Sequence, residues 1–247
     1  MKKFVVILAL ASVLLIPQLA VSDTVTTVGG YGPYQTGQGG EFTLRPDAGL
    51  SYLLSGYVPG TSSDVEGYQN TFQTFCLENA NPPEYIYPNR EHYAVVSNMA
   101  IMGGIGGVDI GGELTGDPLS VGAAYLYSQF LTGNLESYNY NTGTTNRKAS
   151  ANLLQKAFWW LEQEGGEVYN PSNPYELAVL TMFGSETGAR ANNNGQYAVG
   201  VLNLYLDANH TQLAQSQLVG LPVPEPTTIL LLGLGLVGLA GLRRKFF

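Results

Sequence analysis

A single cysteine, Cys76, is the residue of this 247-residue chain with the clearest potential for chemistry. It lies in a strand-like run from Phe72 to Glu78, in which alternation places its side chain on the same face as that of Thr74. One cysteine cannot form a disulfide within the chain, and a free thiol in an oxidising compartment must be buried, modified or used. Cys76 is therefore either a small apolar core residue or a reactive group.

A glutamine, Gln155, stands out because it lies in the most hydrophobic helix that the sequence predicts, Lys148 to Glu164. Leu154, Phe158 and their apolar neighbours at helical spacing form a stripe that faces the core, so Gln155 lies beside it. An amide in that position either bonds to neighbouring backbone or supplies a carbonyl carbon for chemistry.

Together these two segments resemble the paired motifs of bacterial thioester domains. The residues that carry the resemblance are Phe75-Cys76-Leu77 and Leu154-Gln155-Lys156-Ala157-Phe158-Trp159. In that family the cysteine sulfur and the glutamine carbonyl are joined as an internal thioester with loss of ammonia. The resemblance implies that Cys76 and Gln155 form a stored electrophile, open to attack by an amine or hydroxyl on a partner surface. It also implies a β-rich body with a helical part.

Two other roles for Cys76 stay open. In the first, the chain is a passive structural protein of an exopolysaccharide or biofilm matrix, and Cys76 is a buried free thiol. In the second, the chain is a cysteine hydrolase with His92 as base, which requires a low thiol pKa. Cys76 is embedded in a strand, lacks a helix N-terminus to acidify it, and His92 has no evident orienting group. We therefore expect no turnover enzyme.

Metal and cofactor chemistry find little support in the sequence. The two histidines are far apart in sequence, and neither belongs to a zinc-binding spacing. The glycine-rich stretch 103–112 lacks the spacing of a phosphate-binding loop. Asp109, Glu113 and Asp117 are spaced by four without the pattern of a calcium loop, so a solvated acidic face is favoured over a calcium site. We expect no metal and no cofactor.

The order of elements predicts an α+β fold, with a β-rich N-terminal part, sandwich or barrel-like, and a following helical part. The strands are predicted at Thr24 to Val28, Gly40 to Leu44, Leu50 to Val58 and Thr71 to Leu77. The helices are predicted at Leu119 to Leu131, Lys148 to Glu164, Pro174 to Met182 and Gln196 to Leu206, with Ser150 as N-cap of the second. The segment Leu213 to Val223 is expected to return to the sheet.

The N-terminus has the features of a secretory signal peptide over residues 1–22. Two lysines precede a hydrophobic stretch from Phe4 to Ile16, and Ala20-Val21-Ser22 forms a cleavage site. The exported domain, 23–223, then carries 6 basic and 18 acidic residues, a net charge of −12. Such a surface repels phosphate backbones, so nucleic-acid binding is not expected, whereas neutral glycans, cations and basic proteins remain possible partners.

The C-terminal segment, 224–247, has the features of a membrane anchor that carries a sorting signal. Pro224-Glu225-Pro226 leads into an apolar stretch at 227–242, a single transmembrane helix about 24 Å long, and Arg243-Arg244-Lys245 follow as the cytoplasmic end. These features resemble the PEP-CTERM sorting signal of Gram-negative bacteria, in which an exosortase is thought to cut near the motif. The resemblance implies export, transient membrane anchoring, and release to the cell surface or extracellular matrix.

Overall fold

The computed structural model describes residues 23–36, 39–79, 85–101 and 116–222. The expected signal peptide 1–22, the acidic residues Asp109 and Glu113, and the segment 224–247 with its expected transmembrane stretch lie outside the described residues. In the four ranges that the structure does describe, no helix combines the length and the apolar character needed to cross a membrane.

Seven strands form one antiparallel sheet in the order β2-β3-β1-β5-β8-β9, with β4 paired to β3. Their bounds are β1 Thr24–Thr27, β2 Tyr34–Thr36, β3 Gly39–Pro46, β4 Phe72–Thr74, β5 Glu91–Ser97, β8 Val199–Tyr205 and β9 Leu213–Gly220. A separate pair consists of β6 Met99–Ala100 and β7 Asp117–Pro118. The β-rich N-terminal part is therefore confirmed.

The sheet curls so far that the chain just beyond β4 meets its other edge. Cys76 forms an antiparallel bridge with Gln217 of β9, and the Leu77 N–H donates to the Ser216 carbonyl at 3.0 Å. The run from Phe72 to Leu77 thus bonds β3 on one side and β9 on the other, which makes the sheet barrel-like. Cys76 lies at this junction, and two strands separate it from β5 in either direction.

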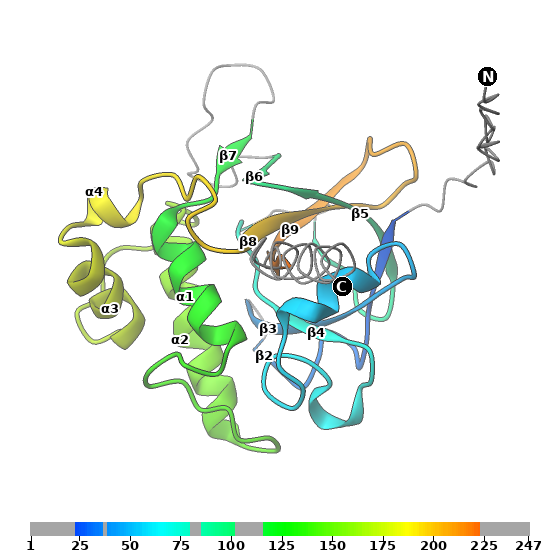
Figure 1. The fold of residues 1–247 in the computed structure, drawn as a ribbon, viewed down its shortest axis with the longest axis horizontal. Helices are drawn as coiled ribbons and strands as arrows, with labels where there is room; N and C mark the ends of the chain where they lie inside the picture. Colours follow the sequence, from blue (N-terminus) through cyan, green and yellow to red (C-terminus); the bar gives the residue numbers. More distant parts are fainter. Residues whose placement is uncertain (1–22, 37–38, 80–84, 102–115, 223–247) are drawn as a thin grey trace, which may run out of the picture.

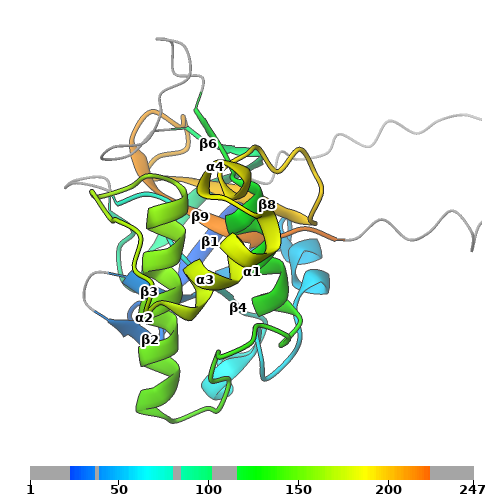
Figure 2. The same ribbon diagram turned by 90° about the vertical axis from the view of Figure 1, so that its left-hand side faces the viewer.

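Helices cover one side of the curled sheet (Figures 1 and 2). The bounds are α1 Val121–Leu131, α2 Thr145–Leu161, α3 Pro174–Phe183 and the short α4 Glu186–Ala189, with short 3₁₀ turns η1 Ser51–Gly56 and η2 Val65–Gly67. The longest, α2, packs along β2 and β3, whereas α1 packs against β8 and β9. Figure 2 shows α1, α2 and α3 in front of the strands.

The helix ends follow ordinary capping chemistry. Ser120 caps α1 by accepting from the Ala123 N–H, and Gly133 adopts the left-handed backbone (φ 75°) just past its end. The cap of α2 is Thr144, which accepts from the Arg147 N–H. The predicted cap Ser150 was wrong, because the helix begins more than one turn earlier and Ser150 lies inside it.

Two predicted elements were wrong. The segment Leu50 to Val58 contains the 3₁₀ turn η1 and no strand; Leu50, just before η1, and Leu53 within it are buried three residues apart, a spacing that fits such a turn. The segment Gln196 to Leu206 is mostly strand β8, whose residues are buried on both faces. A strand buried on both faces shows no alternation, and its apolar run resembles a buried helix. The fold is α+β, with strands on both sides of the helices in sequence.

Candidate functional site

The structure brings Cys76 and Gln155 into direct contact. The Gln155 side-chain oxygen Oε1 accepts from the Cys76 N–H at 3.0 Å, and its nitrogen Nε2 donates to the Cys76 carbonyl at 2.7 Å. Gln155 has no exposed surface, and Cys76 is 1% exposed. The Gln155 amide therefore lies against the Cys76 backbone in a site closed to solvent, although the two residues are 79 residues apart in sequence.

The Gln155 amide occupies the next position of the ladder between β3 and β4. The register pairs Phe42 with Thr74, so a continued ladder would pair Gly40 with Cys76. Instead, the Gln155 Oε1 accepts from both the Cys76 N–H and, at 3.4 Å, the Gly40 N–H. The helix α2 thus inserts one side-chain amide between two strands, where it replaces a backbone peptide.

Two glycines at the start of β3 allow this approach. A Cβ atom at Gly39 would lie 2.6 Å from Gln155 Cγ and 2.9 Å from Trp159 Cη2. Contacts below 3.0 Å are essentially never seen for real Cβ atoms. Gly40 has a φ of 115°, a backbone conformation that side-chain-bearing residues rarely adopt. The Gly39-Gly40 pair therefore makes room for Gln155.

A second contact of α2 continues along the same strand. The Trp159 indole Nε1 donates to the Glu78 carbonyl at 3.2 Å, one helical turn beyond Gln155 and two strand residues beyond Cys76. The four residues from Gln155 to Trp159 rise about 6 Å along the helix, which is close to the span of about 6.7 Å of two strand residues, so the two side chains meet successive outward-facing backbone groups. The Gln155 and Trp159 side chains of α2 therefore hydrogen-bond the backbone groups of Cys76 and Glu78 that β3 leaves unpaired.

The thiol of Cys76 is buried in the hydrophobic core, and the Gln217 side chain lies beside it. The adjacent Phe75 ring packs against Phe130 and Phe158, with ring centroids 5.1 and 5.3 Å apart. Burial raises the pKa of the Cys76 thiol, a hydrogen bond from the Gln217 side chain opposes the rise, and the Glu78 carboxylate adds to it. Gln217 Nε2 lies 3.3 Å from Cys76 Sγ. The free thiol is therefore held in its protonated form.

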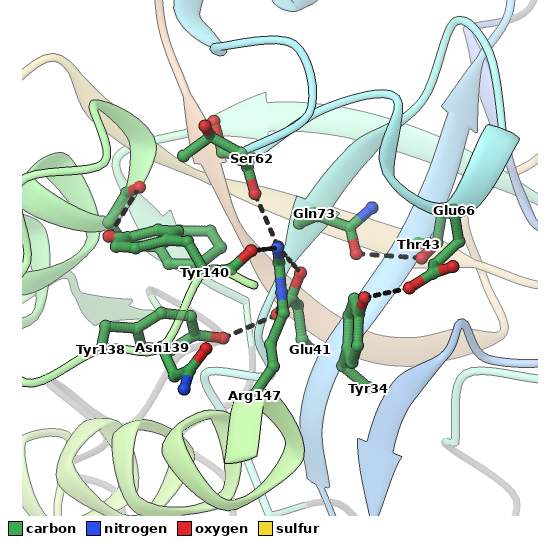
Figure 3. A network of polar contacts seen from close by, with 12 residues as sticks. Tyr34, Glu41, Thr43, Ser62, Glu66, Gln73, Tyr138, Asn139, Tyr140 and Arg147 are labelled. Atoms are coloured by element: carbon green, nitrogen blue, oxygen red, sulfur yellow. Dashed lines mark hydrogen bonds and ion pairs between the residues drawn. The ribbon is translucent and has the colours of Figure 1, made fainter. Parts of the chain in front are cut away.

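A buried ion pair anchors α2 to β3 near this site (Figure 3). The Arg147 guanidinium donates to both carboxylate oxygens of Glu41, at 3.0 Å from Nε and 2.6 Å from Nη2, and neither side chain is exposed. It also donates to the Thr61 and Tyr140 carbonyls, and the Tyr138 hydroxyl donates to Glu41 at 2.6 Å.

This network fixes the position of Gln155. Glu41 directly follows Gly40 in β3, and Arg147 precedes Gln155 by about two turns of α2. Burial raises the pKa of the Glu41 carboxyl, while the bonds from Arg147 and Tyr138 oppose the rise. The pair therefore holds one helix against one strand in a single register beside the Cys76–Gln155 contact.

The arrangement does not support the cysteine hydrolase with His92 as base. His92 belongs to β5, and its ring nitrogens contact the Tyr87 N–H and the Arg90 carbonyl, both at 3.1 Å. Burial lowers the pKa of His92 to about 4. The sheet order separates β5 from Cys76 by two strands on either route, so His92 is not placed to take the thiol proton.

Within the described ranges, no three metal-binding side chains cluster. A cavity of about 900 Å³ lies elsewhere, between the β5–β6 connection, the end of α1 and the segment leading into β8. Its lining has no charged residue, and its polar groups are amides and hydroxyls, among them Asn98, Thr132, Asn194, Gln196 and Tyr197. Neither Cys76 nor Gln155 lines it.

Sequence reasoning identified Cys76 and Gln155 but missed Gln217 and the Glu41–Arg147 pair. A signal for the pair existed, because Arg147 is one of few basic residues in an acidic domain. Gln217 gave no local signal, since its contact with the sulfur depends on the pairing of β9 with the Cys76 segment.

Comparison with known proteins bears on the C-terminal segment. No curated protein and no solved structure matches the chain. Residues 222–245 match the family model of the PEP-CTERM protein-sorting motif, and this range includes Pro224-Glu225-Pro226 and the basic residues Arg243, Arg244 and Lys245. The chain therefore carries a PEP-CTERM sorting motif, which indicates an exported protein that an exosortase processes in association with the membrane.

Proposed function

We propose that this exported protein attaches covalently to a partner surface through a thioester between Cys76 Sγ and the side-chain carbonyl carbon of Gln155. The observation that carries the proposal is the placement of the Gln155 amide against Cys76 in a closed site. The Gly39-Gly40 pair, which admits that amide between two strands, supports it further.

Formation and use of the bond balance without a cofactor. In formation, the sulfur bonds to the amide carbon, the carbon–nitrogen bond breaks, and the thiol proton leaves with the nitrogen as ammonia. In attachment, an amine nitrogen or hydroxyl oxygen of the partner bonds to the carbon, the electron pair of the carbon–sulfur bond returns to sulfur, and a proton restores the thiol. Each molecule reacts once, so the protein is a covalent adhesin and not a turnover enzyme.

Burial explains how such a bond persists in water. Cys76 and Gln155 have almost no exposed surface, and Trp159, one turn along α2 from Gln155, donates to the Glu78 carbonyl beside the site. Water reaches the carbonyl only when the site opens, which slows hydrolysis relative to an exposed thioester. A partner that docks and opens the site delivers its nucleophile at high effective concentration.

The experiment is to incubate the purified protein with a biotinylated primary amine and to map the labelled peptide. Attachment of the amine to position 155, together with a newly titratable thiol at Cys76, supports the proposal. The Cys76→Ala variant serves as control because it lacks the sulfur but keeps the Gln155 amide. Equal labelling of the variant and the wild type, or no labelling of either, would count against the proposal.

A second function is favoured by the neutral cavity of about 900 Å³. Its amide and hydroxyl groups with an apolar floor suit an uncharged carbohydrate, which is the chemistry of a passive component of an exopolysaccharide matrix. In that function Cys76 is a buried free thiol that reacts with thiol reagents only after unfolding. A free thiol in the denatured wild type, with an intact Gln155, would favour this second function.

A further inference from the structure

Gln217 contacts the sulfur of Cys76 from the neighbouring strand. It lies in β9, directly bridged to Cys76, and has no exposed surface. Its Nε2 is 3.3 Å from Cys76 Sγ and 3.2 Å from the Gln215 carbonyl. Sulfur is a weak acceptor while it is neutral, but it becomes a strong one when it carries negative charge.

The other end of this amide is unsatisfied. Among the described residues no donor reaches Gln217 Oε1, although the atom is buried. A buried acceptor without a partner is costly, so this side chain destabilises the fold relative to an apolar residue of similar shape. Stability therefore does not explain a glutamine at position 217, whereas the contact of its Nε2 with the Cys76 sulfur gives it a function.

We infer that Gln217 is a catalytic residue of the thioester, which donates to Cys76 Sγ and stabilises the thiolate that leaves when a nucleophile attacks Gln155. The inference rests on the proposed thioester and adds the group that sets its reactivity. As the carbon–sulfur bond breaks, the electron pair moves onto sulfur beside the Gln217 N–H. The hydrogen bond is therefore stronger in the transition state than in the thioester, which is the condition for acceleration.

The expected size of the effect follows from the charge on sulfur. Hydrogen bonds to charged groups contribute more than those to neutral groups, and their loss here corresponds to roughly tenfold to hundredfold slower opening. Burial opposes departure of the thiolate, because it raises the pKa of the Cys76 thiol, and Gln217 is the hydrogen-bonding group that counters this effect.

The test measures opening of the thioester by methylamine in the purified protein, followed by intact mass and by release of the thiol. Gln217→Met removes the donor and keeps the side-chain length. Gln215→Met is the matched control, because Gln215 is a buried glutamine of the same strand that bonds the Glu78 carbonyl and not the sulfur. We expect slower opening in Gln217→Met and an opening rate near that of wild type in Gln215→Met.

A second variant decides the matter if Gln217→Met fails to fold or to form the bond. In Gln217→Glu the protonated carboxyl can donate to sulfur, whereas the ionised carboxylate repels the thiolate. Its opening rate, relative to wild type at each pH, should fall as pH rises through the pKa of the introduced carboxyl. The Glu78 carboxylate also acts on the Cys76 thiol, but it is present in both proteins, so its effect cancels in the ratio of the two rates.

The possible results distinguish the proposed thioester from the role of Gln217 in opening it. A wild type without a thioester refutes the proposed function itself. A wild type with a thioester that opens at the same rate in Gln217→Met refutes only the role of Gln217. Equal slowing in both methionine variants, or a pH-independent ratio for Gln217→Glu, likewise overturns that role.

Discussion

Replacing Arg147 with methionine should be among the most destabilising single changes in the described domain. Arg147 donates to both oxygens of Glu41 and to the Thr61 and Tyr140 carbonyls, and its guanidinium lies 4.5 Å from the centroid of the Tyr34 ring. Methionine fills part of the volume but donates nothing, so Arg147→Met leaves a buried carboxylate and two carbonyls without these partners.

The magnitude follows from these losses. Breaking a buried ion pair by removing one partner costs about 3–5 kcal/mol, and each unpaired carbonyl costs about 1–3 kcal/mol where water cannot reach it. Protonation of Glu41 and entry of water offset part of this sum. We expect the free energy of unfolding to fall by about 4–6 kcal/mol, a large share of the roughly 5–15 kcal/mol of an ordinary domain.

The assay is urea unfolding followed by the fluorescence of Trp159 and Trp160, both buried in the folded state. Lys148→Met is the matched control, because Lys148 is the exposed neighbour of Arg147 on α2 and should change stability by less than about 0.5 kcal/mol. Adding Glu41→Gln to Arg147→Met should recover part of the loss by removing the stranded charge. A loss below about 1 kcal/mol for Arg147→Met would refute the view that this pair anchors α2 to β3.

Two further substitutions test the packing at Gln155 and the buried carboxyl of Glu162, the residue at the C-terminal end of α2. Gly39→Ala places a Cβ atom 2.6 Å from Gln155 Cγ, so it should destabilise the fold by about 1–3 kcal/mol and reduce thioester yield in intact-mass spectra. Gly60→Ala is the control: it adds backbone strain at a φ of 74° but meets no atom within 4 Å, so it should leave the thioester yield unchanged. Burial raises the pKa of Glu162 from 4.5 to about 8, so the folded state binds the proton more tightly and the contribution of Glu162 to stability falls as pH rises between these values. Glu162→Gln should remove that fall, so in unfolding curves it should be more stable than wild type near pH 8 by on the order of 2–4 kcal/mol and equally stable near pH 4.5. A stability difference that is the same at both pH values would contradict the raised pKa of Glu162.

The helices of the middle of the chain could be predicted from sequence because their signals are local. Apolar spacing and terminal glycines identify α1 and α2, and the same spacing places Gln155 beside the core. The strand β8 could not be identified in this way, because burial on both faces removes the alternation that distinguishes a strand.

The candidate site itself combines a local and a nonlocal part. The resemblance of two short motifs suggested that Cys76 and Gln155 belong together, and the structure places them in contact. The interrupted ladder at Gly40 and the contact of Gln217 with the sulfur depend on the register of β3, β4 and β9, which no local pattern encodes.

The most direct test of the account is the intact mass of the purified protein under non-reducing conditions, together with thiol titration of the denatured chain. The account predicts a mass lower by one ammonia and no titratable thiol, with the mass difference absent in Cys76→Ala. A chain of full mass with one free thiol at Cys76 and an unmodified Gln155 in its peptide map would contradict the thioester. A free thiol with glutamate at position 155 would instead show that the bond had formed and been hydrolysed.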